Sequence, residues 1–509
     1  MVSIVILALL ASLALVLRVK RKRYNTPPGP KGLPIVGNAW DIPKSFEWMT
    51  YAKWGRDYSS DIIYLRIFGT DVIVLNSAKA ADDLLNRRSN IYSDREYMVM
   101  LLDLVGWGGR HFAFQRYGDL WRAHRRLFHQ YFHPAAVPAY YDKETQEARK
   151  LLPRLLEHPD DYMQEIRTMT ASIILGIVFG MELQPNSDPY VAMAEKALNG
   201  MASVGNVGSY MVDYLPWLKY VPSWVPGAGF QRSAAEWRAA TLGMYDKPFQ
   251  SIKHAMASGK APPSILTTML SKLDPDEDNS TRENDMRHVT GTAYAAGADT
   301  TVSSLGTFLL AMVMYPDIQK RAQEEIDRVV GSDRFPSIED KDELPYITAT
   351  MNETLRWRQV TPLGVAHKLR VDDEYNGYHL PAGSIVVGNS WAILHDEERY
   401  PNPDVFDPTR YLTPDGELNK DMPDPEPAFG FGRRICPGRY FAMDSMWIAM
   451  AHILATLNVE KAVDAAGNVI EPSGEYTSGL LSYPVPFKVS FKPRSASALA
   501  LIQPGTSVE

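Results

Sequence analysis

The chain contains a single cysteine, and the short stretch around it constrains the fold more than any other feature. Cys436 lies in residues 429–438, FGFGRRICPG, and it is the only cysteine in 509 residues. A lone cysteine cannot close an internal disulfide, and a zinc site built on cysteines needs more of them. Three interpretations remain for this side chain: a buried small apolar group, a nucleophile, or a single thiolate ligand. For lone cysteines in general, the buried apolar group is the commonest.

The neighbours of Cys436 favour the ligand. Gly432 and Gly438 carry no side chains, so a large flat group could approach the backbone on both sides of the sulfur. Pro437 suits the first turn of a helix, and a helix N-terminus stabilises a thiolate. Arg434 adds a cation two residues away. A thiolate loop with room for a planar anionic macrocycle is what ligation of haem by cysteine requires.

The stretch resembles the haem-binding loop of the cytochrome P-450 superfamily, whose pattern is F-x-x-G-x-R-x-C-x-G. Every fixed position matches, namely Phe429, Gly432, Arg434, Cys436 and Gly438. The resemblance implies haem b as the cofactor, with the sulfur of Cys436 as the axial ligand of its iron and the other four residues in the cofactor site. It also implies a haem-thiolate monooxygenase with the superfamily's fold, which is mainly α with a small β-rich lobe.

Two further motifs extend the resemblance around the haem. Trp121 and Arg125 are four residues apart on a predicted helix and therefore share a face. In isolation such a pair is usually a core Trp beside a solvated Arg, but the superfamily pattern W-x-x-x-R implies that both contact a haem propionate. His367 matches a position where His or Arg binds a propionate, although the residues alone allow a surface histidine equally well.

A long apolar helix is predicted over about residues 288–315, and its centre is polar. Residues 296–301 read AGADTT, so Asp299 makes a membrane span unfavourable. Hydroxyl groups of consecutive threonines compete for backbone carbonyls and loosen a helix, although simple packing of small residues would also explain the stretch. The superfamily segment A/G-G-x-D/E-T-T implies that Asp299 and Thr300 are the catalytic pair that handles dioxygen and protons.

A possible ion-pair cluster follows. Glu353 and Arg356 lie three residues apart on a helix predicted over residues 344–359, which alone would indicate an exposed pair. The superfamily's E-x-x-R motif implies a buried pair completed by a distant arginine, here Arg410. Thr409 replaces the commoner glutamate just before it. We expect this cluster to serve folding and haem retention rather than chemistry.

The β-rich lobe has two candidate hairpins. Residues 62–65 and 71–75 alternate or run apolar around Gly69 and predict the first. Residues 377–388, GYHLPAGSIVVG, predict the second.

The N-terminal part predicts a membrane anchor. Residues 2–17 are apolar and would span about 24 Å as a helix, slightly less than a ~30 Å hydrocarbon core. Basic residues follow this run instead of preceding it, which disfavours a cleaved signal peptide and leaves the remainder in the cytosol. We expect one transmembrane helix within an anchor at 1–23, a Pro/Gly hinge at 24–38 and a catalytic domain at 39–509, located at the endoplasmic reticulum membrane.

The chain has no flavin or nicotinamide fingerprint, so its electrons have to come from a partner. The resemblance implies an NADPH-cytochrome P-450 reductase on the same membrane, which would hold the flavins and use NADPH. Arg433 and Arg439 flank the cysteine loop and, with Arg122 or Arg126, predict a basic docking face. The net charge of −7 and pI near 5.9 argue against a nucleic-acid partner.

The predicted substrate surfaces are apolar. Residues 95–117 predict an adaptable lid, the Trp-rich loop 214–230 could dip into membrane lipid, and the loop 476–485 corresponds to a substrate-contacting loop of the superfamily. We expect a small apolar substrate, a terpenoid of the kind oxidised in fungal secondary metabolism. An aromatic or indolic amine, with Asp103 as its cation partner, is the alternative. A haem-thiolate isomerase or dehydratase and a haem carrier or sensor without turnover also remain.

Overall fold

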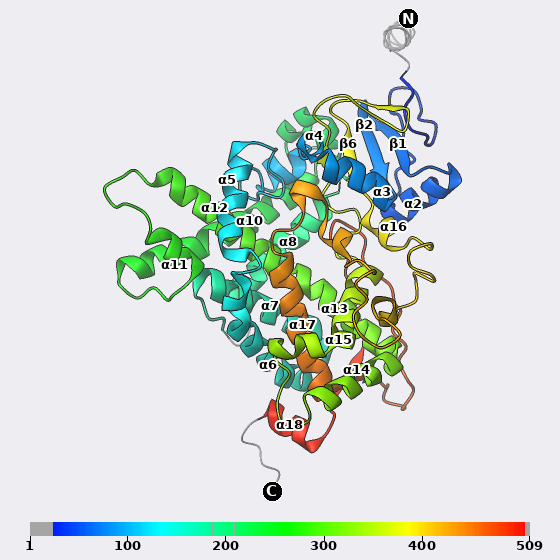
Figure 1. The fold of residues 1–509 in the computed structure, drawn as a ribbon. Helices are drawn as coiled ribbons and strands as arrows, with labels where there is room; N and C mark the ends of the chain where they lie inside the picture. Colours follow the sequence, from blue (N-terminus) through cyan, green and yellow to red (C-terminus); the bar gives the residue numbers. More distant parts are fainter. Residues whose placement is uncertain (1–23, 185–187, 207–208, 504–509) are drawn as a thin grey trace, which may run out of the picture.

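The computed structural model describes residues 24–184, 188–206 and 209–503, and the predicted anchor at 1–23 lies outside them. Helices form most of the protein, and a small sheet lies beside the N-terminal end of the described chain (Figure 1). The prediction of a mainly α fold with a small β-rich lobe is confirmed for these residues.

Ten long helices build the helical part: α5 (Asp119–Phe132), α6 (Tyr141–Glu157), α7 (Tyr162–Phe179), α8 (Pro189–Val204), α10 (Phe230–Ala257), α12 (Ser280–Gly297), α13 (Thr300–Met314), α14 (Pro316–Val329), α15 (Pro345–Trp357) and α17 (Arg439–Thr456). Shorter helices are α2 (Glu47–Asp57), α3 (Ala78–Ala81), α4 (Ser89–Tyr92), α9 (Met211–Tyr214), α11 (Ile265–Leu270), α16 (Ser390–Leu394) and α18 (Ala496–Ile502). Turns of π- or 3₁₀-helix lie between them, namely η1 (Asp82–Arg87), η2 (Met100–Leu104), η3 (Val137–Tyr140), η4 (Pro159–Asp161), η5 (Pro216–Tyr220), η6 (Ile338–Glu343), η7 (Pro408–Tyr411), η8 (Glu426–Phe429) and η9 (Gly432–Arg434).

The centre of the helical part is α13, which packs against α7, α15 and α17 (Figure 1). Its side chains are buried on all faces from Thr301 to Val313, as expected for a helix that is apolar all round. In the described part of the chain, Ser280–Met314 is the one stretch long and apolar enough to cross a membrane, yet 83% of its most apolar window is buried inside the protein. This stretch is therefore a core helix.

The core helix is interrupted at its polar centre. One continuous helix was the expectation over residues 288–315, but α12 ends at Gly297 and α13 begins at Thr300. Asp299 between them has φ −138°, outside the helical range. Thr170 on α7 donates its hydroxyl hydrogen to the carbonyl of Ala298 at 2.8 Å, which satisfies a group that the broken helix leaves open.

The main sheet has four strands in the order β1-β2-β6-β3. Its strands are β1 (Ile62–Ile67), β2 (Thr70–Leu75), β6 (Ile385–Gly388) and β3 (His367–Lys368), with β6 parallel to β2 and β3 antiparallel to β6. The first predicted hairpin is confirmed as β1 and β2. Phe68 and Gly69 at its turn both have positive φ, as a two-residue hairpin turn requires.

The second predicted hairpin is wrong. β5 (Tyr378–Leu380) forms an antiparallel pair with the preceding strand, β4 (Asp373–Tyr375), and not with β6. β6 joins the main sheet instead. The turn between β4 and β5 is Asn376-Gly377, with φ of 51° and 77°. Asn-Gly is a strong short-range hairpin signal, and the sequence analysis overlooked it. A third sheet pairs β7 (Leu457–Lys461) with β8 (Val489–Pro493).

The segment predicted as a Pro/Gly hinge lies against β1 from residue 28 onward. The N–H of Tyr64 donates to the carbonyl of Pro28 at 2.9 Å, and the N–H of Asn38 donates to that of Arg66 at 2.5 Å. The segment therefore covers the outer edge of the sheet, which would otherwise present unpaired backbone groups.

Candidate active site

The loop around the cysteine runs from η8 to the start of α17 and is shaped by glycines. Gly430 and Gly432 have φ of 89° and 54°, which glycine adopts without strain. A Cβ on Gly432 would lie 2.0 Å from the carbonyl oxygen of Leu85. The glycine at this position is therefore required by close packing on η1, and the expectation that it makes room for a flat group does not explain it. At Gly438 the nearest atom to an added Cβ belongs to Phe128, 3.9 Å away, which leaves the predicted space open.

Cys436 is half-buried and lines a cavity of about 280 Å³. Burial raises the pKa of its thiol, while the N–H of Gly438 and the guanidinium groups of Arg125 and Arg439 act in the opposite direction. The guanidinium of Arg434, the cation predicted beside the sulfur, donates to the backbone carbonyls of residues 93, 112 and 115. A coordinated metal ion deprotonates a thiol outright, so Cys436 can act as a metal ligand even though burial raises its pKa.

Three arginines, which we call the cavity arginines, border the same cavity: Arg95, Arg125 and Arg434. Their hydrogen bonds go only to backbone carbonyls, from Arg95 to residues 113, 365 and 366, from Arg434 to residues 93, 112 and 115, and from Arg125 to residue 435. Among the described residues, none of the three forms an ion pair within 4 Å; Asp94, which is paired with Arg116 at 3.8 Å, acts on Arg95 and Arg434 only from a longer distance. Burial lowers the pKa of Arg434 to about 9 and of Arg125 to about 10, and that of Arg95 well below its usual value.

This unbalanced charge tests whether the residues fit a haem. Buried cations need a compensating anion, and the propionate groups of haem are carboxylates. Trp121 also lines the cavity, and its ring lies 4.3 Å from the guanidinium carbon of Arg434. A single available thiolate, several unpaired buried cations and an open face at Gly438 together fit the cofactor.

His367 at the start of β3 also lines the cavity and is 4% exposed, so the surface-histidine interpretation is wrong. Its Nδ1 lies 2.9 Å from the carbonyl oxygen of Tyr92, and because a carbonyl only accepts, Nδ1 carries the proton. Burial and the charge of Arg95 hold the pKa of His367 well below its usual value, which leaves Nε2 an acceptor. To donate to a propionate, His367 needs a second proton, which a nearby anion favours.

Asp299 and Thr300 line the cavity at the helix break. The Oδ1 of Asp299 accepts a hydrogen bond from Nε of Arg167 at 3.1 Å, and its Oδ2 accepts one from the hydroxyl of Tyr483 at 2.5 Å. The hydroxyl of Thr300 donates to the carbonyl of Ala296 at 2.8 Å. The acid and the alcohol are therefore adjacent but not bonded to each other. Arg167 and Tyr483 belong to no motif and lie 132 and 184 residues from Asp299, so the sequence analysis missed them.

The remaining cavity walls are mainly apolar. They include Phe114, Ile174, Leu198, Met201, Ala293, Val360, Leu363, Leu480 and Leu481. The predicted lid at 95–117 reaches the cavity through Arg95 and residues 111–114, whereas Met100 and Trp107 are fully buried in the core. Asp103 does not line the cavity and forms an ion pair with Lys219 at 2.9 Å, so the prediction that it receives a substrate cation is wrong.

The Glu353 cluster comprises Glu353, Arg356 and Arg410. Both oxygens of Glu353 accept hydrogen bonds from Arg356, at 2.7 and 2.9 Å, and Nε of Arg410 lies 3.4 Å from Oε1. The side chains of Glu353 and Arg356 are fully buried, as predicted for the E-x-x-R motif. The N–H of Asp407 also donates to Glu353 at 2.9 Å. No member of the cluster lines the cavity, which agrees with a role in folding.

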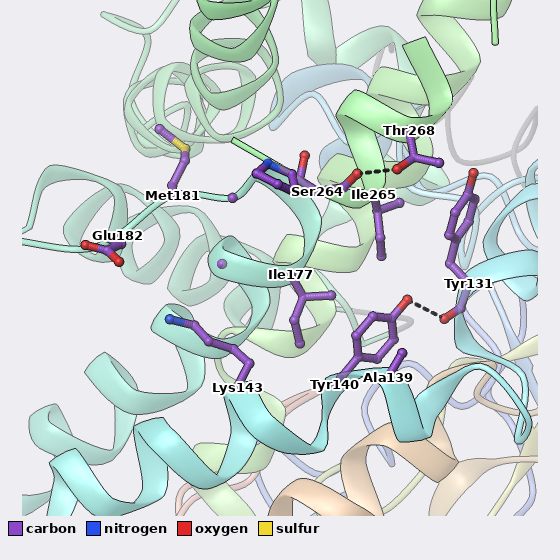
Figure 2. A pocket seen from close by; sticks show the side chains of 13 residues that line it. Tyr131, Ala139, Tyr140, Lys143, Ile177, Met181, Glu182, Ser264, Ile265 and Thr268 are labelled. Atoms are coloured by element: carbon purple, nitrogen blue, oxygen red, sulfur yellow. Dashed lines mark hydrogen bonds between the residues drawn. The ribbon is translucent and has the colours of Figure 1, made fainter. Parts of the chain in front are cut away.

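Two hollows elsewhere have volumes of about 500 and 600 Å³, but their residue chemistry is ordinary. Figure 2 shows the first, between α6, α7 and α11, where Lys143 lies near Ile177 and Glu182 lies beside Met181. Lys143 forms an ion pair with Glu147 at 2.9 Å. Neither hollow contains the cysteine or a cavity arginine, so the cavity at Cys436 is the candidate site.

Comparison with known proteins agrees with this geometry. Residues 27–491 match the cytochrome P-450 family. The chain is 43% identical over 488 residues to the cytochrome P-450 monooxygenase ple1 of Rhodocybe pseudopiperita, covering 95% of this chain and 92% of that protein. It is 41% identical to the cytochrome P-450 monooxygenase eriA of Hericium erinaceus, with 95% and 92% covered. It is 39% identical to the tryptamine 4-monooxygenase of Psilocybe cyanescens, with 95% of each chain covered.

Proposed function

The chain belongs to the cytochrome P-450 family and is a monooxygenase, and from this premise we propose that it oxidises a small, neutral, apolar secondary metabolite, preferably a terpenoid. The observation that carries the proposal is the charge of the cavity lining. Among the described residues that line the cavity, Asp299 is the only acidic side chain, and Arg167 and Tyr483 occupy its two oxygens. The mainly apolar walls favour a neutral, apolar molecule.

An aromatic or indolic amine is the second candidate, and the name of the Psilocybe cyanescens relative favours it. An ammonium group buried without a carboxylate partner is costly. Asp103, the partner first considered, is already paired with Lys219 outside the cavity. The neutral substrate is therefore the better supported of the two.

Matched pairs of compounds test this choice. Farnesol and farnesylamine share one carbon skeleton and differ in charge, as do tryptophol and tryptamine. We expect each alcohol to bind the full-length holoenzyme at least about tenfold more tightly than its amine, because the amine has to bury an unpaired cation. Spectral titration of the ferric protein measures binding, and mass analysis with reductase and NADPH detects the oxygenated product. Tighter binding and turnover of the amines would overturn the proposal.

The family implies a haem-thiolate cofactor, and we propose specific residues of this chain for its site. Cys436 would provide a sulfur ligand to the iron of haem b, and Gly438 the open backbone beside it. The cavity arginines, Trp121 and His367 would hold the propionates, while Phe429 and Gly432 shape the loop. When bound, the haem supplies the activation of dioxygen for insertion of an oxygen atom into a C–H bond.

The other groups manage protons and electrons. Insertion of one oxygen atom into the substrate releases the other as water, so the cycle consumes protons and electrons. Asp299 would hold a proton at its carboxylate, and the Oγ1 of Thr300 would pass it into the cavity, which is general acid catalysis. The family generally implies a redox partner, and we propose an NADPH-cytochrome P-450 reductase that brings its own flavins.

We also propose that the protein is held at the endoplasmic reticulum membrane by residues 1–23, with the catalytic domain in the cytosol. Exposed aromatic side chains at Trp217, Tyr220 and Trp224, which are 61%, 77% and 79% exposed, support a surface that meets lipid. Deletion of residues 1–23 should release much of the protein from membranes and leave some binding through these aromatics. Protection of the catalytic domain from protease in sealed microsomes would contradict this topology.

A further inference from the structure

The loop of residues 476–485 contacts both the cavity and the buried acid at the helix break. Leu480 and Leu481 line the cavity and are each 4% exposed. In the same loop, Tyr483 donates its hydroxyl hydrogen to Oδ2 of Asp299 at 2.5 Å. One short loop therefore joins the space for the substrate to the carboxylate assigned to proton delivery.

Additional hydrogen bonds fasten this loop to α13. Ser303 donates its hydroxyl hydrogen to the carbonyl of Ser482 at 2.5 Å, and the hydroxyl of Tyr476 donates to Oγ1 of Thr307 at 3.1 Å. These contacts lie on both sides of Leu480 and Leu481 along the loop and reach α13 at Ser303 and Thr307.

The two partners of Asp299 are held by different elements. Arg167 on α7 also donates to Gln164 at 3.0 Å and lies 3.7 Å from Glu195. Tyr483 is held within the loop, where its N–H donates to Oγ1 of Thr477 at 3.0 Å and its carbonyl accepts from the N–H of Thr477 at 2.8 Å. Burial and the charge of Asp299 raise the pKa of Tyr483 far above its usual value, so the phenol stays protonated and remains a donor to the carboxylate.

We propose that Tyr483 is a positioning residue that makes proton delivery by Asp299 depend on a substrate seated against Leu480 and Leu481. The inference rests on the proposed function, in which Asp299 and Thr300 deliver protons. To turn toward Thr300, the carboxyl group of Asp299 has to leave one of its two partners. Tyr483 is the partner whose loop the substrate touches, so a seated substrate loosens this hydrogen bond and an empty cavity preserves it.

The proton transfer that follows is balanced. The O–H bond of protonated Asp299 breaks as Oγ1 of Thr300 gains that proton, and Thr300 passes its own hydroxyl proton to a water molecule in the cavity. A hydronium ion from the solvent then protonates Asp299 again and becomes water. No electrons move in this step, so it needs no further reactant.

Tyr483→Phe and Tyr476→Phe are a matched pair of variants that tests the proposal. Each removes one hydroxyl between the same loop and α13, but only the hydroxyl of Tyr483 touches Asp299. We expect Tyr483→Phe holoenzyme, with reductase and NADPH but no substrate, to release hydrogen peroxide about threefold faster or more, since general acids change rates by at least this much. Its solvent deuterium isotope effect should also change, whereas Tyr476→Phe stays close to the wild type.

A second measurement does not depend on turnover. With farnesol bound, hydrogen–deuterium exchange should slow in residues 476–485 and change in residues 299–303 of the wild-type holoenzyme. In Tyr483→Phe the loop should still respond and residues 299–303 should not. Indistinguishable behaviour of the two variants in the substrate-free assay would overturn the positioning role. Absence of a farnesol-induced spectral shift in the wild type would instead overturn the proposed function, a result that the substrate-free assay cannot produce.

Discussion

Two groups of buried arginines in this protein differ in how their charge is met. In the Glu353 cluster, each arginine lies within 3.4 Å of a carboxylate oxygen. The cavity arginines have only backbone carbonyls as partners among the described residues. In the Glu353 cluster the carboxylate neutralises the arginines within the fold, whereas the cavity arginines, which lack such a partner, indicate that a bound anion completes the site.

The largest expected effect is a complete loss of activity while the stability of the fold is almost unchanged. Cys436→Ala leaves both groups of arginines in place and removes the axial sulfur, so monooxygenase activity should be abolished. The reduced, CO-treated protein should lose the strongly red-shifted Soret band of thiolate-bound haem. The haem-free variant should keep its unfolding free energy within about 1 kcal/mol, since the thiol is small. Persistence of the band in folded protein would refute the assignment of the ligand.

Removal of the carboxylate from the Glu353 cluster should be the next largest change. Glu353→Ala leaves two arginines near each other without their anion and should lower the free energy of unfolding by about 3–5 kcal/mol. Denaturant unfolding and the yield of haem-loaded protein measure this loss. Asp57→Ala is the control, because its pair with Lys53 is exposed and should contribute at most about 1 kcal/mol. If Glu353→Ala and Asp57→Ala lost similar amounts of unfolding free energy, the Glu353 cluster would not stabilise the fold more than an exposed ion pair does, and the comparison of the two arginine groups would fail.

Removal of a cavity arginine should weaken haem binding and leave the stability of the fold almost unchanged. Arg125→Met removes a buried cation without stranding a carboxylate, so the unfolding free energy of the haem-free protein should change by about 1 kcal/mol or less. Haem affinity should fall about 10- to 100-fold, as expected from loss of a charge-assisted hydrogen bond of about 1.5–3 kcal/mol.

Transfer of haem to an excess of apomyoglobin measures this affinity. The matched control is Arg154→Met, because Arg154 is a largely buried arginine with its own carboxylate, Glu165, at 3.3 Å. This control should destabilise the fold and leave haem transfer unchanged. If Arg125→Met behaves like the control, the cavity arginines belong to the fold after all.

The smallest effect concerns exposed arginines, whose charge water already screens. Arg439 is unsuited to test the docking face because it donates to the carbonyl of Cys436. Arg126 is exposed on α5, and Arg126→Glu should lower reductase-supported turnover about threefold, more at low salt. Turnover driven by added peroxide should not change, and Lys53→Glu, on α2 beside the β-rich lobe and 64% exposed, serves as the surface control. Equal losses in the two assays would mean that the haem site itself is damaged.

Residues in fixed local patterns were predictable from the sequence. Trp121 and Arg125 share a helix face at i and i+4, and Cys436 lies in a loop of defined spacing, so the structure brings all three to one cavity. The pair of Glu353 and Arg356 was predictable for the same reason. In each case a few neighbouring positions determine where the side chain points.

The remaining site residues depend on tertiary contacts that no local pattern encodes. Arg95 bonds to carbonyls up to 271 residues away, and Tyr483 reaches Asp299 across 184 residues. The hydrogen-bond partners of Arg434 were also unpredictable, because the carbonyls of residues 93, 112 and 115 lie 319 to 341 residues away in the sequence. Such residues are found only when the chain is folded.

The packing of the cysteine loop has a consequence for thermal cooperativity. Phe431 and Leu85 belong to the hydrophobic cluster of the β lobe, and the N–H of Gly432 donates to Asn86 at 2.5 Å. Trp121 belongs to the separate cluster of the helical part. A haem held by Cys436 and by α5 would therefore link two separate hydrophobic clusters. In calorimetry, the loaded protein should melt in one transition, whereas the haem-free chain should lose its two cores at different temperatures.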